Sequence, residues 1–202
     1  MCGRYYVDDD TAREIEKLVR QVDEKMKRTT TSCKVEVTAK DIHPTETAPI
    51  LASSGLGLEC RWQRWGFPGF QKGRVIFNAR SESAMEKPMF REAVLHHRVV
   101  IPAAWFYEWD RNRQKHTFYR EGEDPLFMAG CYRKYEDGDR FVILTTQANA
   151  SMEPIHDRMP LILEREEAVD WLLEDGAAEE LLQKLPPLLE RRAEYEQMSF
   201  FQ

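Results

Sequence analysis

The residue types at the start of the chain are suited to aldehyde chemistry. Cys2 directly follows Met1, so removal of Met1 would place a free α-amine and a thiol on one residue. Such a 1,2-aminothiol condenses with an aldehyde through its amine and then closes onto the iminium carbon through its sulfur, giving a thiazolidine. An α-amine titrates near pH ~8 and a thiol near pH ~8.5, so both need only modest activation. The position alone is weak support, because most second residues have no chemical role.

The composition indicates a single domain. The chain has 202 residues, of which 42% are hydrophobic, enough for one packed core and short for two. We expect one domain over residues 2–202, with Met1 removed, and a monomer suits this size. No apolar run approaches the ~18 residues of a membrane span, and the charged start lacks the apolar segment of a signal peptide. These features predict a cytoplasmic protein without a membrane partner.

The cysteines and the charges exclude several site types. The four cysteines show no Cys-x-x-Cys spacing, which indicates neither a zinc site nor a disulfide framework, and no cofactor motif is visible. Cys33, Cys60 and Cys131 are expected to be buried apolar residues. The net charge is −6, but residues 61–120 hold twelve Lys and Arg against five Asp and Glu, leaving −13 for the rest. This asymmetry favours a confined polyanion site, although solvated loops would give the same pattern.

The hydrophobic patterns predict a mixed architecture. Residues 10–27 have helical spacing after a cap at Asp10 or Thr11, and residues 164–185 predict a helix broken near Gly176. Extended segments are predicted within 56–62, 74–77, 98–109, 125–132 and 141–146. The charged tail after Pro186 is expected to fray. The order indicates an α+β domain with a mostly antiparallel, barrel-like β core and peripheral helices.

Four segments bring reactive residue types to predicted strand ends or loops. They are Met1–Tyr5, Phe77–Glu82, Pro102–Trp109 and Pro154–Pro160. In this order they resemble the SRAP family, the SOS response-associated peptidases, whose members include proteins that crosslink to abasic sites in single-stranded DNA. The resemblance extends from Cys2 through the His156 segment. One motif alone would be weak, whereas four in order are specific.

The resemblance implies four catalytic residues. Cys2 would form the thiazolidine with the ring-opened abasic sugar, and Asn78 would hold that sugar. Glu108 lies among aromatic residues, where desolvation favours a protonated carboxyl and suits it to proton transfer. His156 would steer proton transfer during sugar opening or reversal of the adduct. Taken singly, Asn78 could be a turn former, Glu108 could face solvent and His156 could be structural.

Five further residues are candidates for contacts with DNA. Arg80 and Arg4 would bind phosphate through their guanidinium groups, unless they form ordinary salt bridges. Arg158 would either reach phosphate or fix the histidine loop. The segment 62–70 resembles the Trp-Gly loop of the family, in which Trp65 and Phe70 would stack on bases while Trp62 packs in the core.

The chain departs from the family pattern in two places. Lys40-Asp41-Ile42-His43-Pro44-Thr45 stands where many members read Tyr-Asn-Ile-Ala-Pro-Thr, and Phe70 stands where a second tryptophan often follows. These changes place an acid and a histidine near a loop expected to approach DNA. Base stacking is retained by Phe70, but the path and affinity of the strand are left open.

Three functions are compatible with these residues. The first is a protein of the DNA-damage response that crosslinks to abasic sites in single-stranded DNA through Cys2, near replication-fork proteins, with a slow lyase side activity. The second is a cysteine peptidase or hydrolase in which Cys2, His156 and Glu108 act together. The third is a noncatalytic single-strand-binding module in which Cys2 is dispensable.

Overall fold

The fold begins with a short strand, which is followed by a long helix. The structure is a computed structural model that describes residues 2–27, 35–55, 57–122 and 125–194. Helix α1 (Asp9–Lys25) follows β1 (Tyr5–Val7), and its cap is Asp8, whose side chain accepts a hydrogen bond from the backbone N–H of Thr11 at 2.8 Å. The helix is therefore confirmed, but the predicted cap at Asp10 or Thr11 was wrong, because the aspartate nearest the end of β1 caps the helix.

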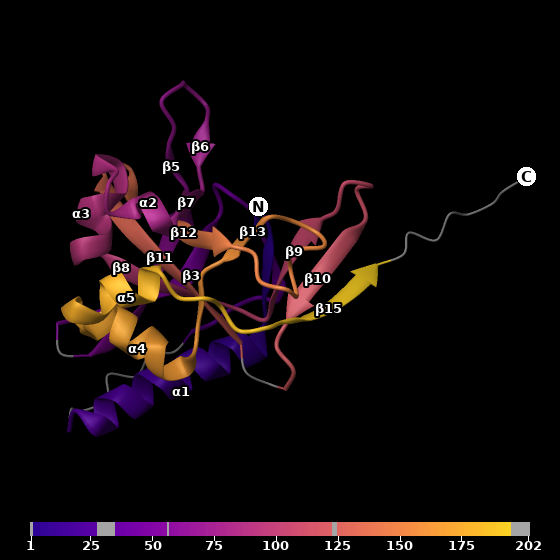
Figure 1. Cartoon of the computed structure of the whole chain (residues 1–202). Coiled ribbons are helices and arrows are strands. Elements are labelled where there is room, and N and C mark those ends of the chain that lie inside the picture. Colours follow the sequence, from indigo (N-terminus) through magenta and orange to yellow (C-terminus); the bar gives the residue numbers. More distant parts are fainter. Residues whose placement is uncertain (1, 28–34, 56, 123–124, 195–202) are drawn as a thin grey trace, which may run out of the picture.

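The strands form two main sheets and one hairpin (Figure 1). The smaller sheet has the order β15 (Glu190–Glu194), β10 (Lys115–Tyr119), β9 (Trp105–Trp109), β1, β2 (Lys40–Ile42). The larger sheet has the order β13 (Arg158–Pro160), β12 (Gly138–Gln147), β4 (Leu58–Trp65), β3 (Thr47–Ser53), β8 (Arg98–Ala103), β11 (Leu126–Tyr135), β14 (Ile162–Leu163), with β7 (Asn78–Arg80) paired to β12. The hairpin consists of β5 (Phe67–Pro68) and β6 (Val75–Ile76).

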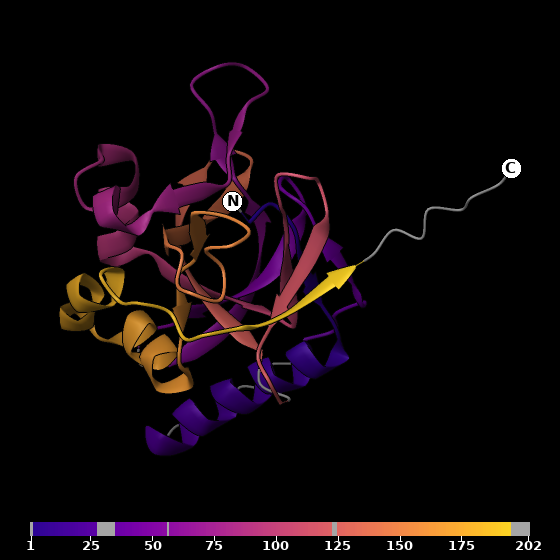
Figure 2. The same cartoon turned by 45° about the vertical axis from the view of Figure 1, so that its right-hand side comes forward.

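Helices cover the outside of this β core (Figure 2). Besides α1 they are α2 (Ser81–Ala84), α3 (Pro88–His96), α4 (Arg165–Leu173), the 3-10 helix η1 (Asp175–Ala177) and α5 (Ala178–Leu182). The strand pairings are antiparallel except for those of β12 with β4 and with β7. The predicted α+β architecture with a mostly antiparallel β core is confirmed. No helix in the described ranges is long and apolar enough to cross a membrane.

Several boundaries differ from the prediction. The extended segment 98–109 is two strands, β8 and β9, which belong to different sheets. The break near Gly176 is confirmed, whereas α2 and α3 were not predicted, although Pro88 at the first position of α3 is a common helix start. The prediction that the tail frays was wrong for β15, which pairs with β10 from Glu190 to Glu194, and residues 195–202 lie outside the described residues. Cys131 is buried as expected, Cys60 is half-buried, and Cys33 and Leu56 lie outside the described residues.

Trp65 belongs to the core, and the prediction that it stacks on bases was wrong. Its side chain has no exposed surface and packs against Tyr5, with ring centroids 5.1 Å apart, and against Phe141. Its indole Nε1 donates to the backbone oxygen of Phe77 at 2.8 Å. Trp62, expected in the core, is 50% exposed. The two tryptophans are three positions apart in an unbroken strand, so they point to opposite faces.

The burial of Trp65 predicts a large difference between the two tryptophans. Trp65→Ala is expected to lower the free energy of unfolding by about 3–5 kcal/mol, because it removes a buried indole and its hydrogen bond. Trp62→Ala, which truncates a half-exposed ring, is expected to cost less than about 1 kcal/mol. Urea unfolding followed by circular dichroism measures both. Equal losses of stability would contradict the assignment of Trp65 to the core.

Candidate functional site

Cys2 is held at the junction of the two sheets. It is fully buried, and its backbone oxygen accepts a hydrogen bond of 2.9 Å from the side-chain Nδ2 of Asn78 in β7. The following strand, β1, pairs with β9, and the backbone N–H of Tyr107 donates to the backbone oxygen of Arg4 at 3.0 Å. Three strands from separate parts of the sequence therefore fix the position of Cys2.

The thiol of Cys2 lies in an environment that keeps it protonated. Burial, together with the carboxylate of Glu108, raises the pKa of this thiol to about 12. Its Sγ lies 3.8 Å from the backbone oxygen of Arg4, a weak thiol hydrogen bond. Glu108 is itself buried in β9, directly opposite His116 of β10. The prediction that Glu108 points inward is confirmed, and the structure brings Cys2, Asn78 and Glu108 together.

Asn78 has a second polar atom for which the described residues provide no hydrogen-bond partner. Its Nδ2 is used by Cys2, while its Oδ1 is buried without a partner among them. β7 is paired in parallel with β12, with Asn78 opposite Ile143, which fixes the direction of the side chain. A buried amide oxygen without a partner is costly to maintain, so it is a natural acceptor for a hydroxyl group of a ligand.

His156 lies in the loop of residues 148–157, which leads into β13. Its side chain is half-buried, and its Nδ1 lies 2.9 Å from both the backbone nitrogen of Arg158 and Oδ1 of Asp157. Nδ1 accepts from the backbone N–H when it is unprotonated and donates to the carboxylate when it is protonated, so the two contacts belong to different states of the ring. The first described residues lie close to β13 in both views of the fold (Figures 1 and 2).

The guanidinium of Arg158 is occupied within the protein. The side chain is mostly buried, and two of its nitrogens bind the two carboxylate oxygens of Glu82 at 2.6 and 2.9 Å. A further bond of 2.5 Å reaches the backbone oxygen of Thr145 in β12. The alternative that Arg158 fixes the start of β13, and with it the histidine loop, agrees with these contacts.

The other two predicted arginines remain at the surface. Arg80 is exposed at the end of β7, two residues after Asn78. Arg4 is half-buried, and its guanidinium lies 5.1 Å from the ring centroid of Trp109 and 3.7 Å from the carboxylate of Asp41. The Asp41 contact arises from the part of the chain that departs from the family pattern. Arg80 is therefore the more accessible of the two for a phosphate.

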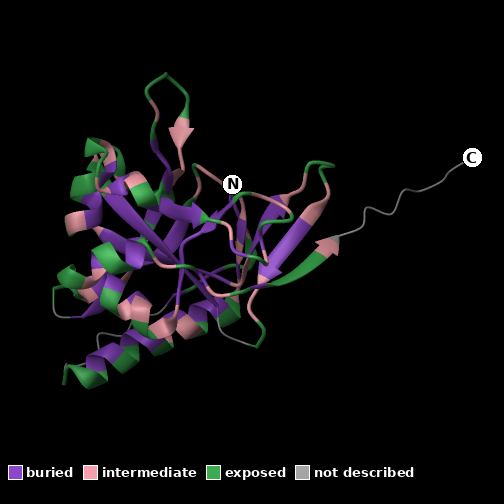
Figure 3. Ribbon diagram, viewed as in Figure 1, coloured by how far each residue is buried: buried purple, intermediate pink, exposed green. Residues whose placement is uncertain are grey.

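Phe70 is carried at the tip of a projecting hairpin. Gly66 has a φ of +111°, a conformation that favours glycine, and it turns the chain out of β4 into β5. A side chain there would also meet Val75. Beyond this turn Phe70 is 90% exposed, and the tip of the hairpin is among the exposed parts of the molecule (Figure 3). The predicted exposure of Phe70 is confirmed, and an aromatic ring in this position is available for stacking.

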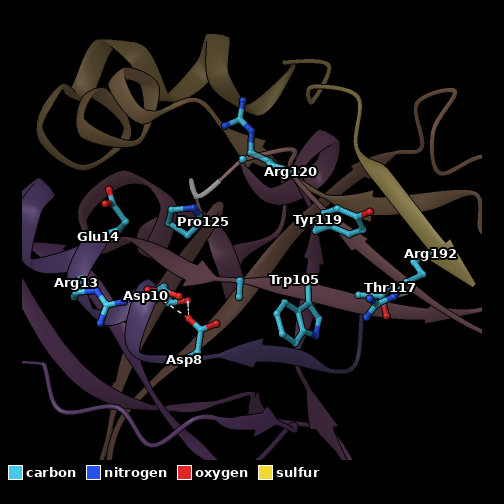
Figure 4. A pocket seen from close by; sticks show the side chains of 13 residues that line it. Asp8, Asp10, Arg13, Glu14, Trp105, Thr117, Tyr119, Arg120, Pro125 and Arg192 are labelled. Atoms are coloured by element: carbon cyan, nitrogen blue, oxygen red, sulfur yellow. Dashed lines mark hydrogen bonds and ion pairs between the residues drawn. The ribbon is translucent and has the colours of Figure 1, made fainter. Parts of the chain in front are cut away.

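A cavity of about 510 Å³ lies elsewhere, at the N-terminal end of α1 (Figure 4). Trp105 lies on one side and acidic residues of α1 on the other. The charged residues there are largely paired, Asp10 with Arg13 and Arg120 with Glu164. None of the sequence-predicted site residues lines this cavity, so the candidate site remains the one around Cys2.

A family model now decides the relationship. The model described as "SOS response associated peptidase (SRAP)" matches residues 1–200. The chain belongs to the SRAP family.

Relatives with curated names agree with this membership. The abasic site processing protein YoaM of Bacillus subtilis is 32% identical over 159 residues, which cover 72% of this chain and 70% of YoaM. YoqW of Bacillus phage SPbeta, with the same description, is 34% identical over 72% of this chain and 71% of its own length. The abasic site processing protein YedK of Escherichia coli is 31% identical over 57% of this chain and 56% of its own length.

Solved structures share the fold of this SRAP member. A protein of Bordetella bronchiseptica superposes with a TM-score of 0.74 at 24% identity, covering 96% of this chain and 100% of that chain. A protein of Bacteroides thetaiotaomicron superposes with a TM-score of 0.72 at 23% identity, covering 95% and 91%. At these identities the likeness concerns the fold alone.

One contributor to the site, Glu82, and the exposure of one tryptophan, Trp62, were missed from the sequence. Glu82 lies within the quoted segment 77–82, but nothing in its spacing indicated that it would bind Arg158. Trp62 is exposed on β4 and was assigned to the core. A helical or strand period reports which side chains share a face, but it does not report which face another element covers.

The Glu82–Arg158 pair predicts a pH-dependent stability. The hydrogen bond from Arg158 lowers the pKa of Glu82 below its ordinary value of 4.5. A carboxylate with a lowered pKa stabilises the fold above that ordinary value and loses this contribution as the pH falls through its folded-state pKa. Glu82→Gln should therefore destabilise the protein at pH 7 by about 1–2 kcal/mol, between the values for surface and buried pairs.

Thermal unfolding of the wild type and Glu82→Gln between pH 3 and pH 7 measures this effect. The difference in Tm should shrink as the pH falls below 4.5. Glu86→Gln, which removes the same charge from an exposed residue of the same region, is the matched control. A difference for Glu82→Gln that stays constant down to pH 3 would be inconsistent with a charge-dependent pair.

Proposed function

We propose that the chain processes abasic sites in single-stranded DNA by forming a covalent thiazolidine through Cys2. The observation that carries this proposal is the environment of Cys2, whose backbone oxygen is held by Asn78 and whose buried thiol has a pKa raised by burial and by the carboxylate of Glu108. The names of the curated relatives support an abasic site as the target. Removal of Met1, by the protein itself or by an aminopeptidase, is part of the proposal because the reaction needs a free amine.

The proposed reaction joins one aldehyde to one aminothiol and releases water. An abasic sugar opens to expose its aldehyde, and the α-amine of Cys2 adds to that carbon. Loss of the carbinolamine hydroxyl as water leaves an iminium ion. The sulfur of Cys2 then adds to the same carbon while its proton passes to a base, and the nitrogen regains its electron pair. The ring that closes removes the free aldehyde and so prevents strand breakage by β-elimination.

Glu108 is suited to both proton transfers of this sequence. A buried carboxylate next to the reacting carbon, after taking a proton from the protonated α-amine, can give it to the departing hydroxyl and then receive one from the thiol. In the chain that still carries Met1, burial and the Glu108 carboxylate raise the pKa of the Cys2 thiol, and the same surroundings support an order in which the freed amine attacks first and the sulfur follows. A cysteine peptidase needs the opposite, a thiol of lowered pKa that attacks first, so this environment favours the crosslinking function over the hydrolase alternative.

Asn78 and His156 would act on the sugar. The buried Oδ1 of Asn78, which lacks a partner among the described residues, can accept a hydrogen bond from a sugar hydroxyl while Nδ2 holds Cys2. His156 can supply the proton that ring opening requires at the sugar oxygen, and the reverse transfer would assist release of the adduct. β-Elimination at the iminium stage would break the strand and give the slow lyase side activity, whereas hydrolysis at that stage returns the free aldehyde and amine.

The surface around this site is suited to binding single-stranded DNA. Arg80 is exposed next to Asn78 and would bind a phosphate, with Arg4 as a second, weaker contact. The exposed ring of Phe70 would stack on a base, a contact that tolerates any sequence and requires an unpaired base. Such strands arise at replication forks, where fork proteins would be neighbours. All of the proposed contacts come from one chain, so a cytoplasmic monomer would suffice.

Covalent capture is the first test of this function. Purified protein, shown by intact mass to lack Met1, is incubated with single-stranded DNA containing one abasic site and analysed on a denaturing gel. A heat-stable band should require both the abasic site and Cys2, and Cys2→Ala should abolish it. Glu108→Gln should slow its formation by about 10²–10⁴-fold. Cys131→Ala, which removes a buried cysteine elsewhere, is the control and should leave the band unchanged.

The alternatives give different results in the same assay. Absence of a band from Met1-free wild-type protein would reject the crosslinking function and direct attention to peptide hydrolysis. A third outcome would favour the noncatalytic binding module. In that case the wild type forms no covalent species, and both the wild type and Cys2→Ala retain the DNA under native washing conditions.

The stacking role of Phe70 can be tested by a binding measurement that does not involve crosslinking. Phe70→Ala should weaken binding to intact single-stranded DNA by about 1–3 kcal/mol, because one base loses its stacking partner. Leu188→Ala removes another exposed apolar side chain, 71% exposed, outside the hairpin and should have no effect. Fluorescence anisotropy at constant salt measures both affinities. Equal affinities for the two variants would show that the hairpin does not stack on the strand.

A further inference from the structure

The histidine loop, residues 148–157, is anchored by the side chain of Asn149. Asn149 is 6% exposed. Its Oδ1 accepts hydrogen bonds from the backbone N–H of Ser151 at 3.0 Å and from the Ser151 hydroxyl at 2.6 Å. Its Nδ2 donates to the backbone oxygens of Pro186 and Pro187 at 3.0 and 2.8 Å. Two donors and two accepting lone pairs are the full hydrogen-bonding capacity of an asparagine, and all are used.

Hydrogen bonds connect Asn149 to His156 in two steps. The backbone oxygen of Asn149 accepts from the N–H of Met152 at 3.0 Å, and the backbone oxygen of Met152 accepts from the N–H of His156 at 3.1 Å. The loop is closed by a bond of 3.0 Å from the N–H of Ala148 to the oxygen of Asp157. A displacement of Asn149 would therefore move the backbone that carries the imidazole ring.

The C-terminal segment, residues 186–194, is the other end of this anchor. Its two prolines have restricted backbones and provide carbonyl oxygens but no N–H groups, so their oxygens are well placed to receive the amide of Asn149. The N–H of Leu189 adds a bond of 3.1 Å to the Ser151 hydroxyl. The segment then becomes β15 and pairs with β10, where His116 lies opposite both Ala193 and Glu108. It runs from the histidine loop to the strand beside Glu108 (Figures 1 and 2).

We infer that Asn149 is a positioning residue for His156, through which the C-terminal segment holds the histidine loop in the geometry needed at the abasic sugar. Asn149 does not touch the reacting atoms, and its effect passes through the loop backbone. The inference rests on the proposed function for the role of His156, while the anchoring itself is independent of it.

A double-mutant cycle tests whether Asn149 acts through His156. Asn149→Ala and His156→Ala are each expected to slow crosslinking by about 10–100-fold, since small misplacements of a reacting group have effects of that size. The double variant should be no slower than the slower single variant, because a misplaced histidine and an absent one lose the same step. Multiplied effects of the two changes would overturn the inference.

Two further variants control for simple loss of stability. Arg98→Leu removes a buried side chain that binds the backbone oxygens of Trp171 and Leu95, so it destabilises the helices α3 and α4 instead of the histidine loop. Its effect on the rate should multiply with that of His156→Ala. Asn149→Asp keeps the acceptor for Ser151 but replaces the donating amide with an oxygen that faces the backbone oxygens of Pro186 and Pro187. This variant should crosslink as slowly as Asn149→Ala. A wild-type rate for Asn149→Asp would overturn the part assigned to the C-terminal segment.

A spectroscopic readout separates this inference from the proposed function. With Nδ1 accepting from the N–H of Arg158, the neutral ring carries its proton on Nε2, which nitrogen-15 chemical shifts of His156 report. Asn149→Ala should shift this signature toward the average of a free imidazole, while Asn112→Ala, in an exposed turn, should not. If the wild type fails to crosslink but the signature changes as expected, the proposed function fails and the anchoring stands. An unchanged signature in Asn149→Ala overturns the anchoring.

Discussion

The candidate site depends on the pairing of a three-residue strand at the start of the chain. Chain ends are usually poorly ordered unless they are built into secondary structure. Here β1 lies between β2 and β9, and the bond from Asn78 to the backbone oxygen of Cys2 extends this order beyond the strand. An amine at a loose chain end would lose much of its effective concentration at a bound sugar. The strand pairing therefore orders Cys2 in the way that side-chain packing orders an internal residue.

Burial at this strand has an electrostatic consequence. The same contacts that order Cys2 exclude water from its thiol and place a carboxylate near it, and both effects disfavour a thiolate. A raised thiol pKa agrees with the proposed order of steps, in which the sulfur acts last and gives its proton to a nearby base. The burial that fixes the position of Cys2 therefore also raises the pKa of its thiol.

Sequence patterns predicted this site unevenly, and the failures have physical causes. Cys2, Asn78 and Glu108 could be named from the sequence because four segments in order resemble the SRAP family, and the strand containing Glu108 could be predicted from its apolar neighbours. The faces of Trp62 and Trp65 were exchanged, because the face of β4 that begins with buried Leu58 becomes exposed toward Trp62 while the opposite face becomes buried. The two alternatives for Arg158 could not be separated from the sequence, because a cation in a loop motif resembles a phosphate ligand until its partner Glu82 is known.

The least predictable feature is the dependence of the histidine loop on the end of the chain. Asn149 and Pro186 are far apart in the sequence, and no sequence pattern predicts that they are in contact. Their contact arises because the chain, after α5, has to cross the molecule to reach the free edge of β10, and it passes the histidine loop on the way. A segment that began as a charged tail in the sequence therefore closes one sheet and supports a loop of the other. In this fold Cys2 is held by β1 and Asn78, while residues 186–189 hold the loop that carries His156, so segments from distant parts of the sequence support the candidate site.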